Sequence, residues 1–582
     1  MSVERLITDN IDVWTSTVKT KSASGRGSSK KIELYGIKKL RELILELAVR
    51  GKLVPQDPTD EPASVLLERI AEEKAQLIKD KKIKKNRKQP TITQEEIYFP
   101  VPANWGYARL EDIYDVRDGT HDSPKPTLEG YPLVTSKNLS SGKLDLSDVK
   151  LISKEDHLKV QERSCVDRDD ILFAMIGSIG NPVIVDIDVE FSIKNVGLFK
   201  YYNRLLSCPN YLNYFLKYAA EIMKKQSAGG VQPFVSLGKL RGFVMLLPPL
   251  AEQNRIVTKV DELMSLCDQL EQQTETSIEA HQTLVEVLLN TLTSSADAQE
   301  LMQNWQRISE HFDALFTTEK SIDTLKQTIL QLAVMGKLVP QDPNDEPAVK
   351  LLERIAEEKA QLIKDKKIKK QKALPEITED EKPFDLPSGW EWCRVQDVAQ
   401  FTTSGSRDWA KYYSDSGALF VTMGNLSRGN YQLRLDNLRY VQPPEGGEGS
   451  RTKLEAHDLL ISITGDVGNL GLIPEGFGEA YINQHTCLLR FMFECQDKYF
   501  PDFMRSPLAK YQFDAPQRGI KNSFRLSDVG EMLLPLPPQK ERKRVAKKVE
   551  DLMIICDQLK TRLKESQTTQ LHLTDAIIDK AL

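Results

Sequence analysis

The residue types that perform chemistry are present in this chain, but not at the spacings that catalysis requires. The adenine methyltransferase signature, Asn or Asp followed by Pro-Pro and an aromatic residue, has no match, and Asn181-Pro182-Val183 is not one. A phosphate-binding GxxxxGK[ST] loop is also absent, since Gly51-Lys52 and Gly336-Lys337 are each followed by leucine. The sequence therefore predicts a chain that is not an enzyme by itself.

Metal and cofactor patterns are missing as well. The seven histidines form no pair at metal-ligand spacing, and the seven cysteines contain no CxxC pair. Such cysteine usage fits a reducing cytoplasm. Gly465, Gly468 and Gly471 resemble a cofactor loop, but Gly177 and Gly180 lie at the first two of these places in an earlier segment, which favours a structural turn. We expect neither a metal nor a cofactor in this chain.

The sequence contains two copies of the elements that would position any functional residue. LAVRGKLVPQDPTDEPASVLLERIAEEKAQLIKDKKIKK starts at Leu47, and a copy with four differences starts at Leu332. The matching continues more loosely: VPANWGYARLEDI resembles LPSGWEWCRVQDV, and DDILFAMIGSIGN resembles HDLLISITGDVGN. A long repeat in two copies indicates an internally duplicated protein with approximate two-fold symmetry.

Periodicity assigns helices and strands to this plan. Apolar residues at Ile37, Leu40, Ile44 and Leu47 predict a helix that Gly51 ends. Short β-rich runs broken by Gly, Asn and Ser predict strand-rich domains between the repeats. Each domain closes with Pro-Pro and a helix whose apolar spacing is that of a coiled coil. The two ends of the chain together then supply what the central helices supply alone, so the duplication is circularly arranged.

Length and composition limit the remaining possibilities. A chain of 582 residues is too long for one core, and about four domains are expected. No apolar run has membrane-spanning length, and the N-terminus does not read as a secretory signal. The net charge of −5 does not by itself indicate a nucleic-acid-binding protein.

The predicted fold class is α+β: two strand-rich, mixed α/β domains separated by long antiparallel coiled-coil helices. The predicted boundaries are 1–36 (N-terminal helix and a flexible tether centred on 15–31), 37–90 (first helical repeat), 91–250 (first strand-rich domain), 251–375 (central helices with the second repeat), 376–538 (second strand-rich domain) and 539–582 (C-terminal helix).

These motifs, in this order, resemble the specificity subunit of Type I restriction–modification enzymes over essentially the whole chain. The resemblance rests on the Pro-x-x-Trp openings at Pro102–Trp105 and Pro387–Trp390, the Leu-Pro-Pro exits and the GKLVPQDP blocks. The blocks are similar to those of the family branch with a large central repeat.

The resemblance implies a DNA-reading function without chemistry in this chain. Each strand-rich domain would recognise one half of a split, asymmetric site in double-stranded DNA, and the helices would set the gap. Two adenine methyltransferase subunits and ATP-driven restriction subunits would join it, so S-adenosylmethionine, ATP and Mg would bind to those partners. Such a complex would act in the cytoplasm, with no membrane contact.

Polar, donor-rich loops of the two domains are the candidate DNA contacts, because Arg and Lys pair with guanine and Asn and Gln with adenine. About half of them could be ordinary loop polarity, and Asn138 and Asn425 are read as scaffold. The candidates are Thr120, His121, Ser123, Lys125, Ser136, Lys137, Gln226, Gln232 and Lys239 in the first domain, and Ser404, Ser406, Arg407, Lys411, Arg518, Lys521, Asn522 and Ser523 in the second.

Two further features of the repeats invite partners. The lysine runs at 79–88 and 364–372 could contact phosphates, although solvated helix ends explain them equally well. Apolar repeat positions are candidates for docking methyltransferase subunits, against the alternative of an intramolecular seam. They are Leu66, Leu67, Ile70 and Leu77, with Leu351, Leu352, Ile355 and Leu362 in the second copy.

Three other functions stay open at this point. The chain could be a duplicated coiled-coil scaffold whose domains bind proteins, since its net charge is acidic. It could be a fused enzyme, which the missing motifs disfavour. It could also serve methylation only, without a restriction subunit. The target bases and the gap length do not follow from the sequence.

Overall fold

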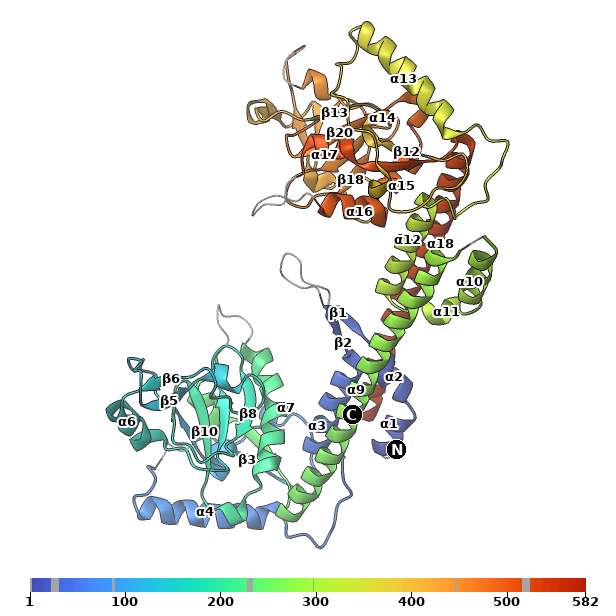
Figure 1. Cartoon of the computed structure of the whole chain (residues 1–582). Coiled ribbons are helices and arrows are strands. Elements are labelled where there is room, and N and C mark those ends of the chain that lie inside the picture. Colours follow the sequence, from blue (N-terminus) through green and yellow to red (C-terminus); the bar gives the residue numbers. More distant parts are fainter. Residues whose placement is uncertain are drawn as a thin grey trace. The chain divides into compact units, whose positions relative to one another are not determined.

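The computed structural model describes residues 3–21, 31–85, 89–227, 234–296, 298–444, 446, 449–515 and 524–582 (Figure 1). The chain divides into two compact units. The first unit comprises Met1–Ser277 with Gln567–Leu582, and the second comprises Ile278–Ser566. The boundary falls within two long helices, α9 (Leu250–Ser294) and α18 (Gln539–Ala581).

The first unit opens with the helices α1 (Val3–Thr8), α2 (Ile11–Ser16) and α3 (Tyr35–Val49). Between α2 and α3, strand β1 (Lys19–Lys21) pairs antiparallel with β2 (Lys31–Glu33). The flexible tether predicted over 15–31 is therefore wrong at both ends; its middle, 22–30, lies outside the described residues. Strands of three residues are too short to show an alternating hydrophobic pattern, so the sequence does not predict β1 and β2.

The glycines after the repeat helices are required by two constraints. Gly51 follows α3 with φ of 69°, and Gly336 follows the equivalent α12 (Glu319–Val334) with φ of 68°. A Cβ on Gly51 would lie 2.6 Å from Pro102 Cγ, and one on Gly336 would lie 2.5 Å from Pro387 Cγ. The GK and Pro-x-x-Trp motifs are therefore in contact in both units.

The second repeat helices bury one face each. Helix α4 (Ala63–Lys79) packs on the short α5 (Leu110–Ile113), as α13 (Ala348–Lys364) packs on α14 (Val395–Val398). Each is amphipathic, with small and branched apolar residues at spacings of three and four on the buried side. The buried positions are Ala63, Leu66 and Ile70 in the first copy and Ala348, Leu351 and Ile355 in the second.

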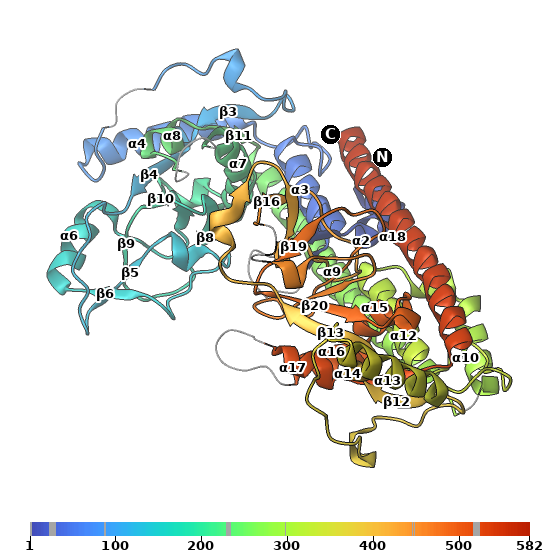
Figure 2. The ribbon, with the colours of Figure 1, turned by 90° about the horizontal axis from the view of Figure 1, so that it is seen from above.

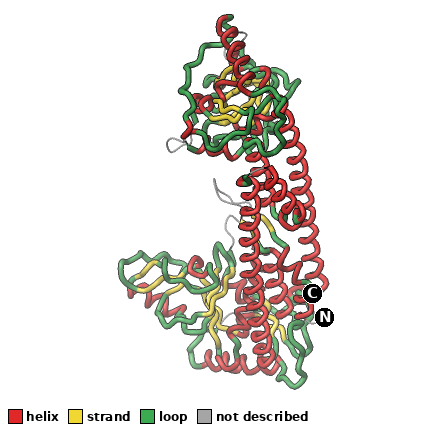
Figure 3. Tube along the Cα trace, turned by 45° about the vertical axis from the view of Figure 1, so that its right-hand side comes forward, coloured by secondary structure: helices red, strands yellow, loops and turns green. Residues whose placement is uncertain are grey.

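The two globular domains share one sheet topology. In the first domain a four-stranded antiparallel sheet has the order β4-β10-β7-β8, a three-stranded sheet has the order β6-β5-β9, and β11 pairs with β3. The second domain repeats this order as β13-β20-β17-β18, β14-β16-β15-β19 and β12-β21, with β14 as an additional edge strand of the middle sheet. In each middle sheet one pair is parallel, β5 with β9 and β15 with β19. Figure 3 shows the strands of each domain gathered among loops.

The bounds of the strands are as follows. They are β3 (Gly106–Arg109), β4 (Tyr114–Asp118), β5 (Tyr131–Val134), β6 (Lys150–Ile152), β7 (Ile171–Ala174), β8 (Gly180–Ile184), β9 (Ser192–Ile193), β10 (Val196–Tyr201), β11 (Val244–Leu247), β12 (Glu391–Arg394), β13 (Ala399–Ser404), β14 (Tyr413–Ser414), β15 (Ala418–Val421), β16 (Arg439–Val441), β17 (Leu459–Ser462), β18 (Leu470–Leu472), β19 (Ala480–Ile482), β20 (Thr486–Phe491) and β21 (Leu533–Leu536).

Helices cover the sheets and close the cores. In the first domain α7 (Pro209–Ser227) packs against β8, and α6 (Lys154–Ser164) lies beside β9 (Figure 2). Every residue of β7 is buried, as expected for a strand covered on both faces. The other helices are α8 (Leu237–Gly242), α10 (Ala298–Glu310), α11 (Phe312–Leu315), α15 (Tyr499–Met504), α16 (Pro507–Asp514) and α17 (Leu526–Glu531).

The end of α18 completes the first unit. Thr574 Oγ1 donates to Thr17 Oγ1 at 3.0 Å, and the Tyr35 hydroxyl donates to Asp575 Oδ1 at 3.1 Å. Both contacts join the last helix to the N-terminal elements. The repeats predict a circular arrangement, and the structure agrees with it, because both ends of the chain belong to the first unit.

Candidate nucleic-acid interface

A short connection between two sheets organises the polar loops of each domain. In the first domain β9 passes to β10 through Lys194 and Asn195. The backbone of Thr120, in the loop after β4, bridges this connection: its N–H donates to Ile193 O at 2.9 Å, and its carbonyl accepts from Asn195 N at 3.1 Å. We name residues 194–195 the first junction and residues 483–485, between β19 and β20, the second junction.

Side chains of the first junction hold the predicted DNA loop. His121 Nδ1 lies 2.9 Å from Asn195 Oδ1, and its Nε2 lies 3.0 Å from the buried carboxylate of Asp118. Lys194 Nζ donates to Ser123 Oγ. The structure thus brings the predicted Thr120, His121 and Ser123 together with Lys194 and Asn195, and it leaves the predicted Lys125 exposed in the same loop.

The next predicted segment follows β5 as a short 3-10 helix, Ser136–Leu139. Ser136 is half-buried, whereas Lys137 is exposed and forms an ion pair with Asp148. Asn138 in this helix is 5% exposed and accepts from Thr135 N at 2.9 Å; Asn425 in the second domain is buried in the same way. Both asparagines are thus held inside their domains by bonds to the adjacent turn.

Gln226 and Lys239 lie at another place in the first domain. Both line a pocket of about 350 Å³, together with Gln89 and Tyr98, and Gln226 Nε2 donates to the Tyr98 hydroxyl at 3.2 Å. The remaining predicted residues of this region and of its counterpart lie outside the described residues. They are Gln232, Arg518, Lys521, Asn522 and Ser523.

The loop after β13 carries the predicted residues of the second domain. Ser404 ends β13, and Ser406 forms a parallel bridge with Asn483 of the second junction. Arg407 and Lys411 are exposed. Between them Trp409 is only 2% exposed and packs on Phe420 and Tyr481. This buried anchor fixes the loop while its charged residues stay at the surface.

The second junction contains a chain of linked side chains that the sequence did not single out. Gln484 Nε2 lies 2.9 Å from His485 Nε2, and His485 Nδ1 lies 2.8 Å from Thr464 Oγ1. Both junctions escaped sequence reasoning, because only the fold brings them beside the predicted loops. The signal present in the sequence was the match of FSIKNV, which starts at Phe191, with AYINQHT, which starts at Ala480. These segments contain the two junctions.

A buried ion pair braces the four-stranded sheet of each domain. Lys200 Nζ lies 2.5 Å from Asp170, and Arg490 Nη2 lies 2.7 Å from Asp458. Burial raises the pKa of both carboxyl groups, and the facing cations oppose that shift. Asp170 and Asp458 directly precede β7 and β17, whereas Lys200 and Arg490 lie in β10 and β20. Each pair therefore ties together two neighbouring strands of the sheet that carries the loops.

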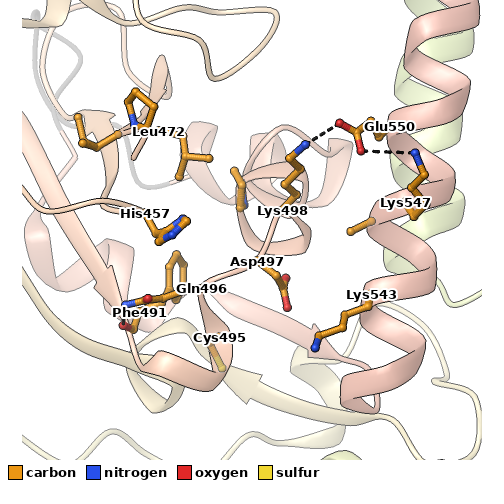
Figure 4. Close-up of a pocket in the computed structure, with 14 residues that line it drawn as sticks. His457, Leu472, Phe491, Cys495, Gln496, Asp497, Lys498, Lys543, Lys547 and Glu550 are labelled. Carbon is orange, nitrogen blue, oxygen red and sulfur yellow. Dashed lines mark hydrogen bonds and ion pairs between the residues drawn. The ribbon is translucent and has the colours of Figure 1, made fainter. Parts of the chain in front are cut away.

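A pocket of about 460 Å³ separates α18 from the second domain (Figure 4). Lys498 and Lys547 both approach Glu550, at 2.5 and 3.9 Å, and Asp497 pairs with the buried Arg542. The ion pairs that Lys498 and Asp497 form join α18 to the second domain across the pocket.

The predicted docking residues divide into two groups. Leu66, Ile70, Leu351 and Ile355 are at most 4% exposed, so the prediction that a partner contacts them is corrected: they form the core of their own units. Leu67, Leu77, Leu352 and Leu362 are half-buried. Amphipathic spacing identified an apolar face but could not tell an internal face from an external one.

The lysine runs follow helix ends and do not extend the helices. Helix α4 stops at Lys79 and α13 at Lys364, and Lys81 and Lys366 adopt positive φ of 57° and 58°. Most residues of both runs are exposed where the structure describes them. The helix dipole therefore favours only the lysine that ends each helix, and the others remain available to solvent or to phosphates.

Two further properties hold for the part of the chain that the structure describes. No helix there combines the length and apolarity needed to cross a membrane. Nor do three or more His, Cys, Asp or Glu side chains gather there as a possible metal site.

The duplicated, loop-bearing domains match known proteins. The family described as Type I restriction modification DNA specificity domain matches residues 102–280. The EcoAI specificity subunit of Escherichia coli is 40% identical, and the EcoEI specificity subunit of Escherichia coli is 39% identical, each over 100% of both chains. A solved HsdS subunit from Thermoanaerobacter tengcongensis covers 83% of this chain and 98% of its own, with 17% identity and a TM-score of 0.40.

Identities of 40% and 39% over the full length of both chains assign this chain to a protein family. The chain belongs to the family of Type I restriction enzyme specificity subunits. It is the DNA-specificity component of such a system, and it is non-catalytic.

Proposed function

We propose that this subunit reads a bipartite, asymmetric target in double-stranded DNA, one half-site by each globular domain, over 91–250 and 376–538. The observation that carries the proposal is the pair of junctions. The two domains share their sheet topology, yet their junctions differ in length and side chains. Domains built alike that differ where polar side chains gather are suited to read different sequences.

Spacing of the two half-sites is the second part of the proposal. One base-edge contact discriminates by about 1–3 kcal/mol, so a short half-site is weakly specific. Two half-sites joined at a fixed separation gain specificity through effective concentration. Helices α9 and α18 each contribute residues to both units and are suited to fix that separation.

The exposed face of the repeat helices supports docking of two copies of one partner, which we propose to be the adenine methyltransferase subunit. Exposed helix positions tolerate substitution within about 0.5 kcal/mol, so the fold does not demand identity there. Yet beyond the first turn, from Leu66 onward, four exposed positions of α4 recur unchanged in α13. They are Glu68, Glu72, Ala75 and Gln76, matched by Glu353, Glu357, Ala360 and Gln361.

An apolar side chain projects next to each of these faces. Leu205, in a short helix that contacts α4, is 85% exposed, and its counterpart Phe493 is 81% exposed. Glu494 beside Phe493 pairs with Arg354 of α13 at 3.0 Å. Exposed apolar residues surrounded by polar ones are typical of protein interfaces. ATP-driven restriction subunits would complete the complex, and S-adenosylmethionine, ATP and Mg would bind in the partners.

Methylation-aware sequencing of genomic DNA, with and without this gene, tests the proposed function. The expected result is a gapped adenine-methylated motif that disappears when the gene is deleted. An unchanged methylome in cells that express the methyltransferase would instead favour a scaffold that binds proteins.

A further inference from the structure

The two junctions start from the same framework and then diverge. Ile193 pairs with Val134, and Ile482 pairs with Val421, in the same parallel register. The strands that follow begin at Val196 and Thr486. Two residues fill the first junction and three fill the second, so one residue is added where the flanking strands correspond. Because the frame is common, the added residue changes what the second domain presents and leaves its core unchanged.

The backbone of the second junction is fixed on both sides. His485 N donates to Asn483 Oδ1 at 3.1 Å, and Ile463 N donates to His485 O at 3.0 Å. Gly405 N also donates to Asn483 O at 3.1 Å, which ties the junction to the loop after β13. The Cα of Gln484 is therefore held between two anchored neighbours.

The side chain of Gln484 is oriented by a relay. Its amide meets His485 Nε2 at 2.9 Å, and His485 Nδ1 meets Thr464 Oγ1 at 2.8 Å. If the amide N–H donates to the imidazole, the ring donates onward to the threonine. If the threonine donates, the ring donates to the amide oxygen. In both arrangements the amide uses one hydrogen-bonding position on histidine and keeps an oxygen lone pair and an N–H on one edge.

That remaining edge matches one base. An amide that offers an acceptor and a donor side by side pairs with N6 and N7 of adenine in the major groove. Within the described residues, His485 is the only hydrogen-bond partner recorded for the Gln484 side chain, which is half-buried. An oriented amide loses less conformational entropy on pairing than a free one.

We propose that Gln484 reads an adenine in the half-site of the second domain, with His485 and Thr464 as positioning residues. This inference rests on the proposed function, because it presumes that this domain faces DNA. It adds the base, the reading residue and the relay that holds it.

Methylation-aware sequencing of cells that carry the full system with Gln484→Ala tests this. One adenine position of one half-site is expected to become degenerate, with discrimination there falling roughly 5- to 150-fold. The other half-site and the spacer stay unchanged and report that the complex folds and assembles. Gln484→Glu, which accepts only, is expected to move the same position towards cytosine. Thr464→Val, which breaks the relay but leaves the amide, is expected to weaken that position less.

Gln396→Ala is the matched control, because Gln396 is a half-buried glutamine of the same domain whose amide donates to Lys372 O at 2.9 Å. It should leave the motif intact. An unaltered motif with Gln484→Ala overturns the inference. If Gln484→Ala abolishes all modification, the near-isosteric Gln484→Met decides: a single degenerate position supports base reading, and renewed loss of both half-sites assigns a structural role. Absence of any wild-type motif dependent on this gene rejects the proposed function itself.

Discussion

The indole N–H of Trp105 donates to the carboxylate of Glu252 at 3.0 Å, joining the Pro-x-x-Trp opening of the first domain to the first turn of α9. Gln56 of the GKLVPQDP block donates to the other oxygen of Glu252 at 2.6 Å. In the second unit Gln341 donates to Glu541 at 3.1 Å. Three motifs that are distant in the sequence therefore meet at one buried carboxylate in the first unit.

Glu252→Ala should destabilise the first unit by about 1–3 kcal/mol, since it leaves the buried indole N–H of Trp105 without its acceptor and removes the partner of the Gln56 amide. Hydrogen exchange measured by mass spectrometry should show faster exchange in the GKLVPQDP loop and in the first turns of α9. Glu541→Ala is the matched change and should act on the second unit instead. Equal protection in both units for both variants would contradict this role.

Asp502 should make the second unit less stable as pH rises. It lies among apolar side chains of α12 and α18 and pairs with Arg505 at 2.9 Å. Burial raises its pKa to about 7, so between about pH 4 and pH 7 the folded state holds a proton that the unfolded state releases. Stability should therefore fall across this window, by at most about 1.4 kcal/mol per pH unit.

Urea titrations from pH 4.5 to 7.5, followed by hydrogen exchange in peptides of α15, measure this dependence. Asp502→Asn should remove the slope, because an amide does not titrate there. The exposed Asp415→Asn in the same domain should leave it in place. A slope that survives in Asp502→Asn would assign the pH dependence to another group.

Lengthening the two long helices should lengthen the spacer of the recognised motif. Four residues inserted after Ser277 in α9 and four after Ser566 in α18 add about one turn, or roughly 5–6 Å at 1.5 Å per residue. DNA rises about 3.4 Å per base pair, so the gap should grow by one or two base pairs with both half-sites unchanged. Methylation-aware sequencing reads the spacer directly, and an unchanged spacer would refute the ruler.

Leu205→Asp and Phe493→Asp should each remove one methyltransferase copy from the complex. A charge on an exposed apolar anchor must be desolvated on docking, whereas the folded subunit alone is little affected. Native mass spectrometry of the co-expressed complex should count one copy for each single variant and none for the double variant. Leu66→Ala is the control for lost stability, because Leu66 is a core residue. Two copies retained in the double variant would exclude this surface.

Patterns local in sequence predicted much of the fold. Helix α3 carries the expected apolar spacing and ends before Gly51, and the duplicated segments fold into sheets of one topology. Hydrophobic periodicity predicts which residues form an apolar face. It does not tell whether that face packs within the same chain or against a partner. For that reason the periodicity predicts Leu66 and Ile70 as docking residues, although they are buried within their unit.

The candidate DNA surface was only partly predictable for a related reason. Ser406 and Asn483 are far apart in the sequence, and their bridge lies next to the antiparallel pairing of β13 with β20, in which Ser404 opposes Cys487. No spacing rule connects residues across such a pairing. Loop polarity predicted Ser406 as a site residue, but only the fold shows that Asn483 lies beside it.

Membership of Gln567–Leu582 in the first unit has a consequence for biosynthesis. The ribosome finishes Ser277 long before it reaches these residues; at about 5–20 residues per second the delay is roughly 15–60 s. During that interval the N-terminal half lacks the helix that bonds Thr17 and Tyr35. The first unit therefore matures only at the end of translation, and a premature stop near the C-terminus damages the part of the protein that was made first.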